Sequence, residues 1–202
     1  MPYDYCMVQN EEKLPKSPFP AWLGLILLSP LRKIMVQRDR FLRKAGIRIG
    51  NTILELGCGP GFFTEYIAKI VTLSGTVYAQ DVQSEFIETL EKRMKRFEVT
   101  ENIKPLLCSS TKVPLPDSSV NVVYAANVFE EIEKEGLLEK TAKEIDRLLV
   151  SDGLVTVIEH RFGVSKARYQ RIIDSLKNEG FVPVRRKVTP FMHFTMLRRK
   201  SS

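Results

Sequence analysis

The sequence predicts a doubly wound α/β fold, whose mostly parallel seven-stranded sheet ends in an antiparallel hairpin at the C-terminus. Three observations carry this prediction. From about residue 52 onward, short apolar strands alternate with amphipathic helices, as in a parallel sheet covered on both faces. The stretch ILELGCGPG (53–61) joins the first strand to the first helix through three glycines. Only a short turn separates the last two apolar stretches, so we expect them to pair.

Length and composition fit one globular domain. The chain has 202 residues, of which 44% are hydrophobic and 27% charged, enough for one core. We expect residues 1–44 to form an N-terminal arm with an apolar and basic cap, and residues 45–202 to form the main domain. Cys6, Cys58 and Cys108 are odd in number and far apart, which predicts neither a disulfide framework nor a zinc site. This cysteine usage indicates a reducing, cytoplasmic location.

The first half of the chain shows helical and strand patterns in alternation. Pro30 opens a basic, helix-like stretch, and Ser84 is expected to cap a helix whose acids come early and bases late, as the helix dipole favours. Apolar residues at helical spacing indicate the helices, and short apolar runs indicate the strands. The expected elements are a helical stretch to about Lys44, strand 52–56, helix 62–71, strand 76–81, helix 84–97 and strand 103–108.

The second half continues the same alternation. Ser165 is expected to begin a helix that Gly180 ends, and Thr189 and Pro190 form the turn of the final hairpin. The expected elements are strand 121–126, a helix from about 134 to 149, strand 154–160, helix 165–180, and strands 181–188 and 193–198.

The glycine-rich turn predicts a ligand site. In a sheet of this type ligands bind beyond the carboxyl ends of the strands, and glycine lets a ligand approach the main chain without meeting a Cβ. A side chain placed at Gly57 or Gly59 is therefore expected to collide with the ligand. The spacing is G-x-G-x-G, and Phe62 stands where a dinucleotide fingerprint has its third glycine, which disfavours an NAD(P)-linked oxidoreductase. The chain contains no P-loop sequence, which excludes nucleotide binding of that kind.

ELGCGPG at the end of a first strand resembles motif I of the class I S-adenosylmethionine (SAM)-dependent methyltransferases. The resemblance covers about residues 45–198 and continues in three further stretches, YAQDVQSEFIETL, VPLPDSSVNVVYAANVFEEI and RLLVSDGLVTVIEH. Within the family it is similar to the methyltransferase type 11 group and the quinone-biosynthesis methyltransferases. It implies a Rossmann-like fold, methyl transfer from SAM and release of S-adenosylhomocysteine (SAH).

The resemblance also implies roles for individual residues. Asp81 would accept hydrogen bonds from the ribose hydroxyls, which suits a carboxylate, and Glu55 would lie near the amino group and sulfonium. Two structural alternatives stay open: Glu55 as a strand acid satisfied by backbone amides, and Asp81 as a capping acid ahead of Ser84. Val82 would lie beside the adenine, and Asn127 would face the methionine end. The implied cofactor site comprises Glu55, Gly57, Cys58, Gly59, Gly61, Asp81, Val82, Ser109 and Asn127.

The chain departs from the family pattern in places that bear on catalysis. Ser109 stands where an adenine-binding acid is usual, and Glu130 stands where a His is frequent, so a His base is not expected. Glu130 and Glu131 are the candidate bases, although a run such as EEIEKE is also typical of a solvated helix start. His160 and His193 are isolated and lack metal-ligand spacing, so no metal site is predicted.

The methyl acceptor is expected to be small and hydrophobic, lipid-like or quinone-like. The apolar run AWLGLILL (21–28) is shorter than the roughly 20 residues of a membrane span, and no signal-peptide pattern surrounds it. Three interpretations of this N-terminal segment stay open: a core-packed cap, a lid over the acceptor, or an interfacial anchor with Arg32 and Lys33 on anionic lipid. The third would place the protein peripherally on the inner face of the membrane.

The positive charge of the chain is concentrated at its C-terminus. Residues 161–202 hold 11 Lys/Arg and 2 Asp/Glu, a balance of +9, whereas the whole chain has a net charge of +7. A solvated sheet edge explains this charge, and a surface for phosphate, lipid or RNA is the alternative. We expect only weak, sequence-independent RNA binding. An RNA methyltransferase and a non-catalytic SAM-binding module are the two alternative functions.

Overall fold

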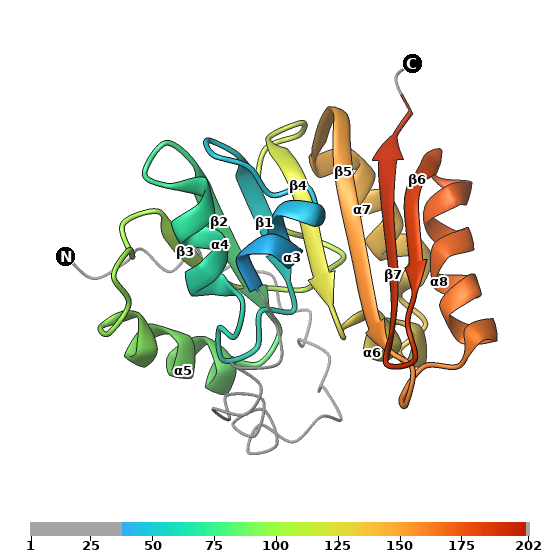
Figure 1. Ribbon diagram of the computed structural model, residues 1–202, viewed down its shortest axis with the longest axis horizontal. Coiled ribbons are helices and arrows are strands. Elements are labelled where there is room, and N and C mark those ends of the chain that lie inside the picture. The colour runs from blue at the N-terminus through green and yellow to red at the C-terminus, as the bar shows by residue number, and fades with distance from the viewer. Residues whose placement is uncertain (1–37, 201–202) are drawn as a thin grey trace.

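The computed structural model describes residues 38–200 and contains one seven-stranded sheet in the order β3-β2-β1-β4-β5-β7-β6 (Figure 1). All neighbouring pairs among β1 to β5 are parallel, whereas β7 is antiparallel to both β5 and β6. The doubly wound fold and the C-terminal hairpin are thus confirmed. The strands are β1 (Thr52–Leu56), β2 (Thr76–Asp81), β3 (Ile103–Leu107), β4 (Val120–Ala126), β5 (Leu149–His160), β6 (Phe181–Val188) and β7 (Met192–Arg199).

Six described helices cover the two faces of this sheet. The alternation of side chains along each strand divides the core, so that Ile53 packs on one face and its neighbour Leu54 on the other. Leu42 packs in the same core cluster as Ile53, which joins the end of the predicted N-terminal segment to the main domain. One face carries α3 (Arg38–Lys44), α4 (Thr64–Val71) and α5 (Ser84–Met94), and the other carries α6 (Phe129–Lys134), α7 (Leu138–Leu148) and α8 (Lys166–Asn178).

The strand order creates a crevice at one end of the sheet. β1 pairs with β2 on one side and with β4 on the other, so the strand order reverses next to β1, and the loops that follow β1 and β4 lead to helices on opposite faces. In α/β sheets the loops separate at such a reversal and leave room for a ligand. The end of β5 and the turn between β6 and β7 lie at the same end of the molecule, beside α6 (Figure 1).

Several predicted boundaries need correction. The helix expected from about 134 to 149 is α7, which begins at Leu138 after a turn at Gly136 (φ +71°), and the short helix α6 ahead of it was not among the expected elements. The N-cap of α5 is Gln83 and not Ser84, and β5 begins at Leu149, before the expected strand 154–160. The helix expected from residue 62 begins at Thr64. The interpretations of the N-terminal apolar run concern residues outside the described range.

No helix among residues 38–200 is both long and apolar enough to cross a bilayer.

Candidate active site

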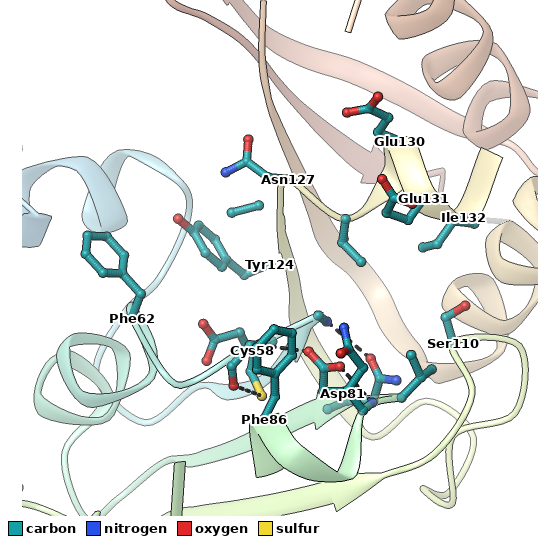
Figure 2. Close-up of a pocket in the computed structure, with 18 of the residues that line it drawn as sticks. Cys58, Phe62, Asp81, Phe86, Ser110, Tyr124, Asn127, Glu130, Glu131 and Ile132 are labelled. Atoms are coloured by element: carbon teal, nitrogen blue, oxygen red, sulfur yellow. Dashed lines mark hydrogen bonds between the residues drawn. The ribbon is translucent and has the colours of Figure 1, made fainter. Parts of the chain in front are cut away.

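A cavity of about 310 Å³ lies at the carboxyl ends of β1, β2, β4 and β5. Figure 2 shows its two sides: Asp81, Cys58 and Phe86 on the side of the glycine-rich turn, and Glu130, Glu131 and Ile132 on the side of α6. The described lining residues include six acids and no Lys or Arg: Glu55, Asp81, Glu130, Glu131, Glu135 and Glu159. The cavity therefore favours a ligand that carries positive charge.

Each of the three positions in the turn requires glycine for a different structural reason. All have positive φ, at +68° for Gly57, +54° for Gly59 and +80° for Gly61. A Cβ at Gly59 would meet nothing within 4 Å, so this glycine opens the cavity. A Cβ at Gly57 would lie 2.5 Å from the Val128 side chain, and one at Gly61 would collide with Leu90. The obstacle at Gly57 is thus the half-buried Val128 side chain and not the ligand, and Gly61 is not among the lining residues.

Gln80, a buried residue of β2 that was not predicted as a site residue, holds the glycine-rich turn in place through hydrogen bonds. Its side-chain oxygen accepts the Gly57 N–H at 3.2 Å, and its side-chain nitrogen donates to the Cys108 carbonyl at 2.5 Å. Its own carbonyl accepts the Cys58 N–H at 2.8 Å. One buried side chain thereby connects the ends of β1, β2 and β3.

Asp81, at the end of β2, is buried and faces the cavity. Its Oδ2 accepts the Gly59 N–H at 2.8 Å, and its Oδ1 accepts the Gln83 N–H at 3.0 Å. Burial raises the pKa of Asp81, and the backbone hydrogen bonds oppose that shift. Because Gln83 is itself the N-cap residue, this bond fixes the turn ahead of α5 and does not cap the helix. Each carboxylate oxygen still has a lone pair for a ligand hydroxyl.

Glu55, in the middle of the apolar strand β1, is buried at the floor of the cavity. Its Oε2 accepts a hydrogen bond from the Thr64 hydroxyl at 2.6 Å, so its observed partner is a side chain and not the backbone amides of the alternative. Burial raises the pKa of Glu55 to about 8. A positively charged ligand group beside it would favour the ionised form.

The candidate bases Glu130 and Glu131 line the cavity but are already paired. Lys134 Nζ lies 3.0 Å from Glu130 and 2.8 Å from Glu131, and Arg168 lies 3.3 Å from Glu130. Glu159, at the end of β5, is a further acid in the lining, and it is buried. Its Oε1 accepts the Phe129 N–H at 2.9 Å, and burial raises its pKa to about 8. The ending IEH of an apolar strand was the signal for it, of the same kind as Glu55.

The remaining predicted residues divide between the lining and the periphery. Cys58, Val82 and Asn127 line the cavity, and Asn127 Oδ1 accepts the His160 N–H at 3.0 Å. Ser109 does not line it; the neighbouring Ser110 does. Of the two isolated histidines, His160 belongs to the lining and His193 does not, and Phe63 is a further lining residue. Within residues 38–200, no three His, Cys, Asp or Glu side chains group as metal ligands.

Comparison with known families and curated proteins places the chain among methyltransferases. The methyltransferase domain family matches residues 53–153, half of the chain. A demethylmenaquinone methyltransferase from Lactobacillus johnsonii is 26% identical over 60% of this chain and 49% of its own length. A ubiquinone/menaquinone biosynthesis C-methyltransferase from Citrobacter koseri is 23% identical over 57% of this chain and 45% of its own length. The chain spans about half the length of these relatives.

Among solved structures, a SAM-dependent methyltransferase from Aquifex aeolicus is similar over 90% of this chain and 99% of its own. The two superpose with a TM-score of 0.79 at 23% sequence identity. At this identity the likeness establishes the fold, including the strand order that forms the cavity.

Proposed function

The chain belongs to the class I SAM-dependent methyltransferase family, and from that premise we propose that it methylates a small hydrophobic acceptor of the quinol type. The observation that carries the proposal is that one cavity combines polar groups suited to SAM with an apolar lining. Glu55, Asp81 and the open Gly59 backbone lie at the ends of β1 and β2, and the apolar wall of the same cavity is made by side chains near α4, α5 and α6. The apolar lining residues are Phe62, Phe63, Phe86, Val128, Ile132 and Leu137.

The residues on the side of β1 and β2 fit SAM. Asp81 is held by two backbone amides with lone pairs directed to the cavity, as recognition of the ribose hydroxyls needs. Glu55 offers a buried carboxyl to a cationic group, and Gly59 leaves the main chain bare toward the cavity. When bound, SAM supplies a methyl group on a cationic sulfur. Holding the acceptor in line with that methyl could lower the barrier by ~7–11 kcal/mol.

We assign the apolar wall to the acceptor. Aromatic and aliphatic side chains favour a flat, uncharged ring over a charged metabolite. The names of the relatives from L. johnsonii and C. koseri agree with this choice, since both describe methylation in quinone biosynthesis. Because the chain spans only about half of those proteins, the acceptor rests on the cavity as well as on the names.

Glu159 is the proposed proton acceptor. A ring hydroxyl of the acceptor becomes a stronger electron donor when its proton is removed. A carboxyl with a pKa of about 8 is mostly protonated at pH 7 and becomes an effective proton acceptor as the pH rises toward 8. Glu159 is bonded only to backbone N–H in the described contacts, whereas Glu130 and Glu131 are each held by a cation. It therefore replaces them as the preferred base.

The test is transfer of a labelled methyl group from SAM to reduced demethylmenaquinone in detergent. We expect label in the quinone product, and a drop in kcat of at least ~100-fold in Glu159→Gln, in line with the usual contribution of a general base. Gln can still accept the Phe129 N–H, so SAH affinity should stay unchanged. Glu131→Gln is the matched control, because it also lines the cavity and should keep its rate. Absence of label in any reduced quinone, with SAH bound, would refute the acceptor.

A further inference from the structure

Two exposed aromatic rings lie next to each other at the cavity end of the sheet. Phe162 is 84% exposed and Phe191 is 60% exposed, and their ring centroids are 6.4 Å apart. Val188, at the end of β6 and three residues before Phe191, is 52% exposed. We call these three residues the aromatic lip. Large apolar side chains gathered on a surface mark a contact site more often than isolated ones do.

The lip is held rigidly by hydrogen bonds between its two loops. The Arg161 N–H donates to the Phe191 carbonyl at 3.1 Å, and its guanidinium donates to the Thr189 carbonyl at 3.1 Å. Within the turn, the Thr189 hydroxyl accepts the N–H groups of Phe191 and Met192. The exposure of the two rings is thus a property of an ordered surface.

The lip lies at the border of the cavity. His160 lines the cavity and directly precedes Arg161 and Phe162 in the chain. A Cβ at Gly163 would lie 2.7 Å from the carboxylate of Glu130, which also lines the cavity. Both loops lie at the end of the sheet where α6 lies (Figure 1). A surface that touches the lip would therefore face the proposed acceptor site.

The charges around the lip are positive. Arg161, Lys166 and Lys187 are exposed, and Asp174 and Glu179 are the only acids in residues 161–202. The nearest described acids on α6 are neutralised in ion pairs, Glu130 with Lys134 and Arg168, and Glu133 with Arg168 and Arg171. Two copies of the chain that met at the lip would bring these cations together. A negatively charged partner fits instead.

We infer that the aromatic lip docks the protein on an anionic lipid surface, with Phe162 and Phe191 in the headgroup boundary and the cations on lipid phosphates. Aromatic rings prefer that boundary, and basic side chains near it are attracted to anionic lipid. The inference rests on the proposed hydrophobic acceptor, which is dissolved in such a layer. Docking at the lip would let the acceptor pass from lipid to cavity without crossing water.

Vesicle flotation of the full chain tests the docking. We expect binding to vesicles of equal parts phosphatidylglycerol and phosphatidylcholine, and a loss of at least about tenfold in F162S/F191S. The control is I49S/L73S, which removes side chains that are 65% and 70% exposed away from the lip, and it should bind like wild type. K166Q/K187Q should weaken binding to the anionic vesicles but not to pure phosphatidylcholine.

A fluorescence measurement locates the contact directly. Trp22 is the single tryptophan of the chain, so W22F/F162W carries one probe at the lip. Its emission should be quenched by brominated acyl chains. Unquenched emission on bound vesicles would show that another surface makes the contact.

Other outcomes would also overturn the inference. The inference fails if wild type does not float with the anionic vesicles, if F162S/F191S floats like wild type, or if I49S/L73S loses as much binding as F162S/F191S. It also fails if wild type is a dimer and F162S/F191S dissociates it. Tight RNA binding that needs both rings would replace lipid by nucleic acid. SAH titration of the same variants separates the two proposals, because a failed docking result leaves SAH affinity and methyl transfer to a detergent-dissolved acceptor unaffected.

Discussion

Glu55 combines a buried position in an apolar strand with a cavity that is open to a cation. Its hydrogen bond to the Thr64 hydroxyl holds it in place, and burial keeps it protonated near neutral pH, with a pKa of about 8. The sequence alone marked this residue, because an acid within a buried strand needs a reason. Its partner could not be foreseen, since Thr64 comes from the first turn of α4.

A pH titration of ligand affinity tests this residue. Below pH 8 the free protein holds a proton on Glu55, whereas cationic SAM favours the ionised carboxylate, so binding releases that proton. Affinity for SAM should therefore rise with pH, by up to about tenfold per pH unit, and level off above the pKa of about 8. Calorimetry across this range should show the rise in wild type and in Glu88→Gln, an exposed control. An equally steep rise in Glu55→Gln would assign the proton to another group.

Gln80 and Glu159 show where residue-level prediction failed. Both are polar residues in strands, and the sequence showed them as parts of apolar patterns. Gln80 acts by joining groups on three strands, and that arrangement depends on the strand order. The sequence shows Glu159 as an acid in an apolar strand, but its contact with the turn into α6 depends on β5 lying beside β4.

Among the elements, the glycine-rich turn contains one glycine that packing requires, Gly57, and one that leaves the main chain open to a ligand, Gly59. The sequence predicted the same reason for Gly57 and Gly59, which is that a side chain at either position would collide with the ligand. The structure assigns the first to contact with Val128 and leaves the second bare. A pattern of glycines identifies the turn, but only the packing of α6 onto it tells the glycines apart.

Alanine substitutions can distinguish these reasons. Gly59→Ala should lose only the ~1–2 kcal/mol of a strained left-handed backbone, yet weaken SAH binding at least tenfold. Gly57→Ala should lose more stability, and Val128→Ala added to it should restore part of that loss. Urea unfolding and SAH titration measure both quantities. If folded Gly59→Ala bound SAH like wild type, the ligand would not pass over this glycine.

The helix predicted over 134–149 illustrates why boundaries fail. α6 was missed and α7 begins four residues later than expected, because apolar residues recur at helical spacing on both sides of Gly136 and periodicity alone does not mark the break. The break lets α6 stay at the cavity while α7 packs along the sheet. Strand identities and the hairpin were correct because they depend on local apolar runs and turn residues.

For the whole molecule, two buried acids make stability depend on pH. Glu55 and Glu159 have folded-state pKa values of about 8, raised from 4.5, so the folded state binds more protons than the unfolded state between those values. The free energy of unfolding should therefore fall as pH rises through this window, by roughly 1 kcal/mol per pH unit for each group.

Urea unfolding at the two ends of the window checks this. Glu159→Gln should show a shallower decline and be more stable than wild type near the upper end. Exposed Glu139→Gln should follow wild type. A stability that increases from the lower to the upper end, or an unchanged slope in Glu159→Gln, would contradict burial of an ionisable acid there.

The central claim is that the cavity at the ends of β1 and β2 binds SAM through Asp81. Calorimetric titration with SAH tests it most directly, with Asp81→Ala compared with Asp174→Ala, a surface control on α8. Charged hydrogen bonds contribute ~1.5–3 kcal/mol each, so we expect one SAH site in wild type and in the control, and at least tenfold weaker binding in a folded Asp81→Ala. SAH binding of equal strength in Asp81→Ala, or binding of NADH in place of SAH, would contradict the account.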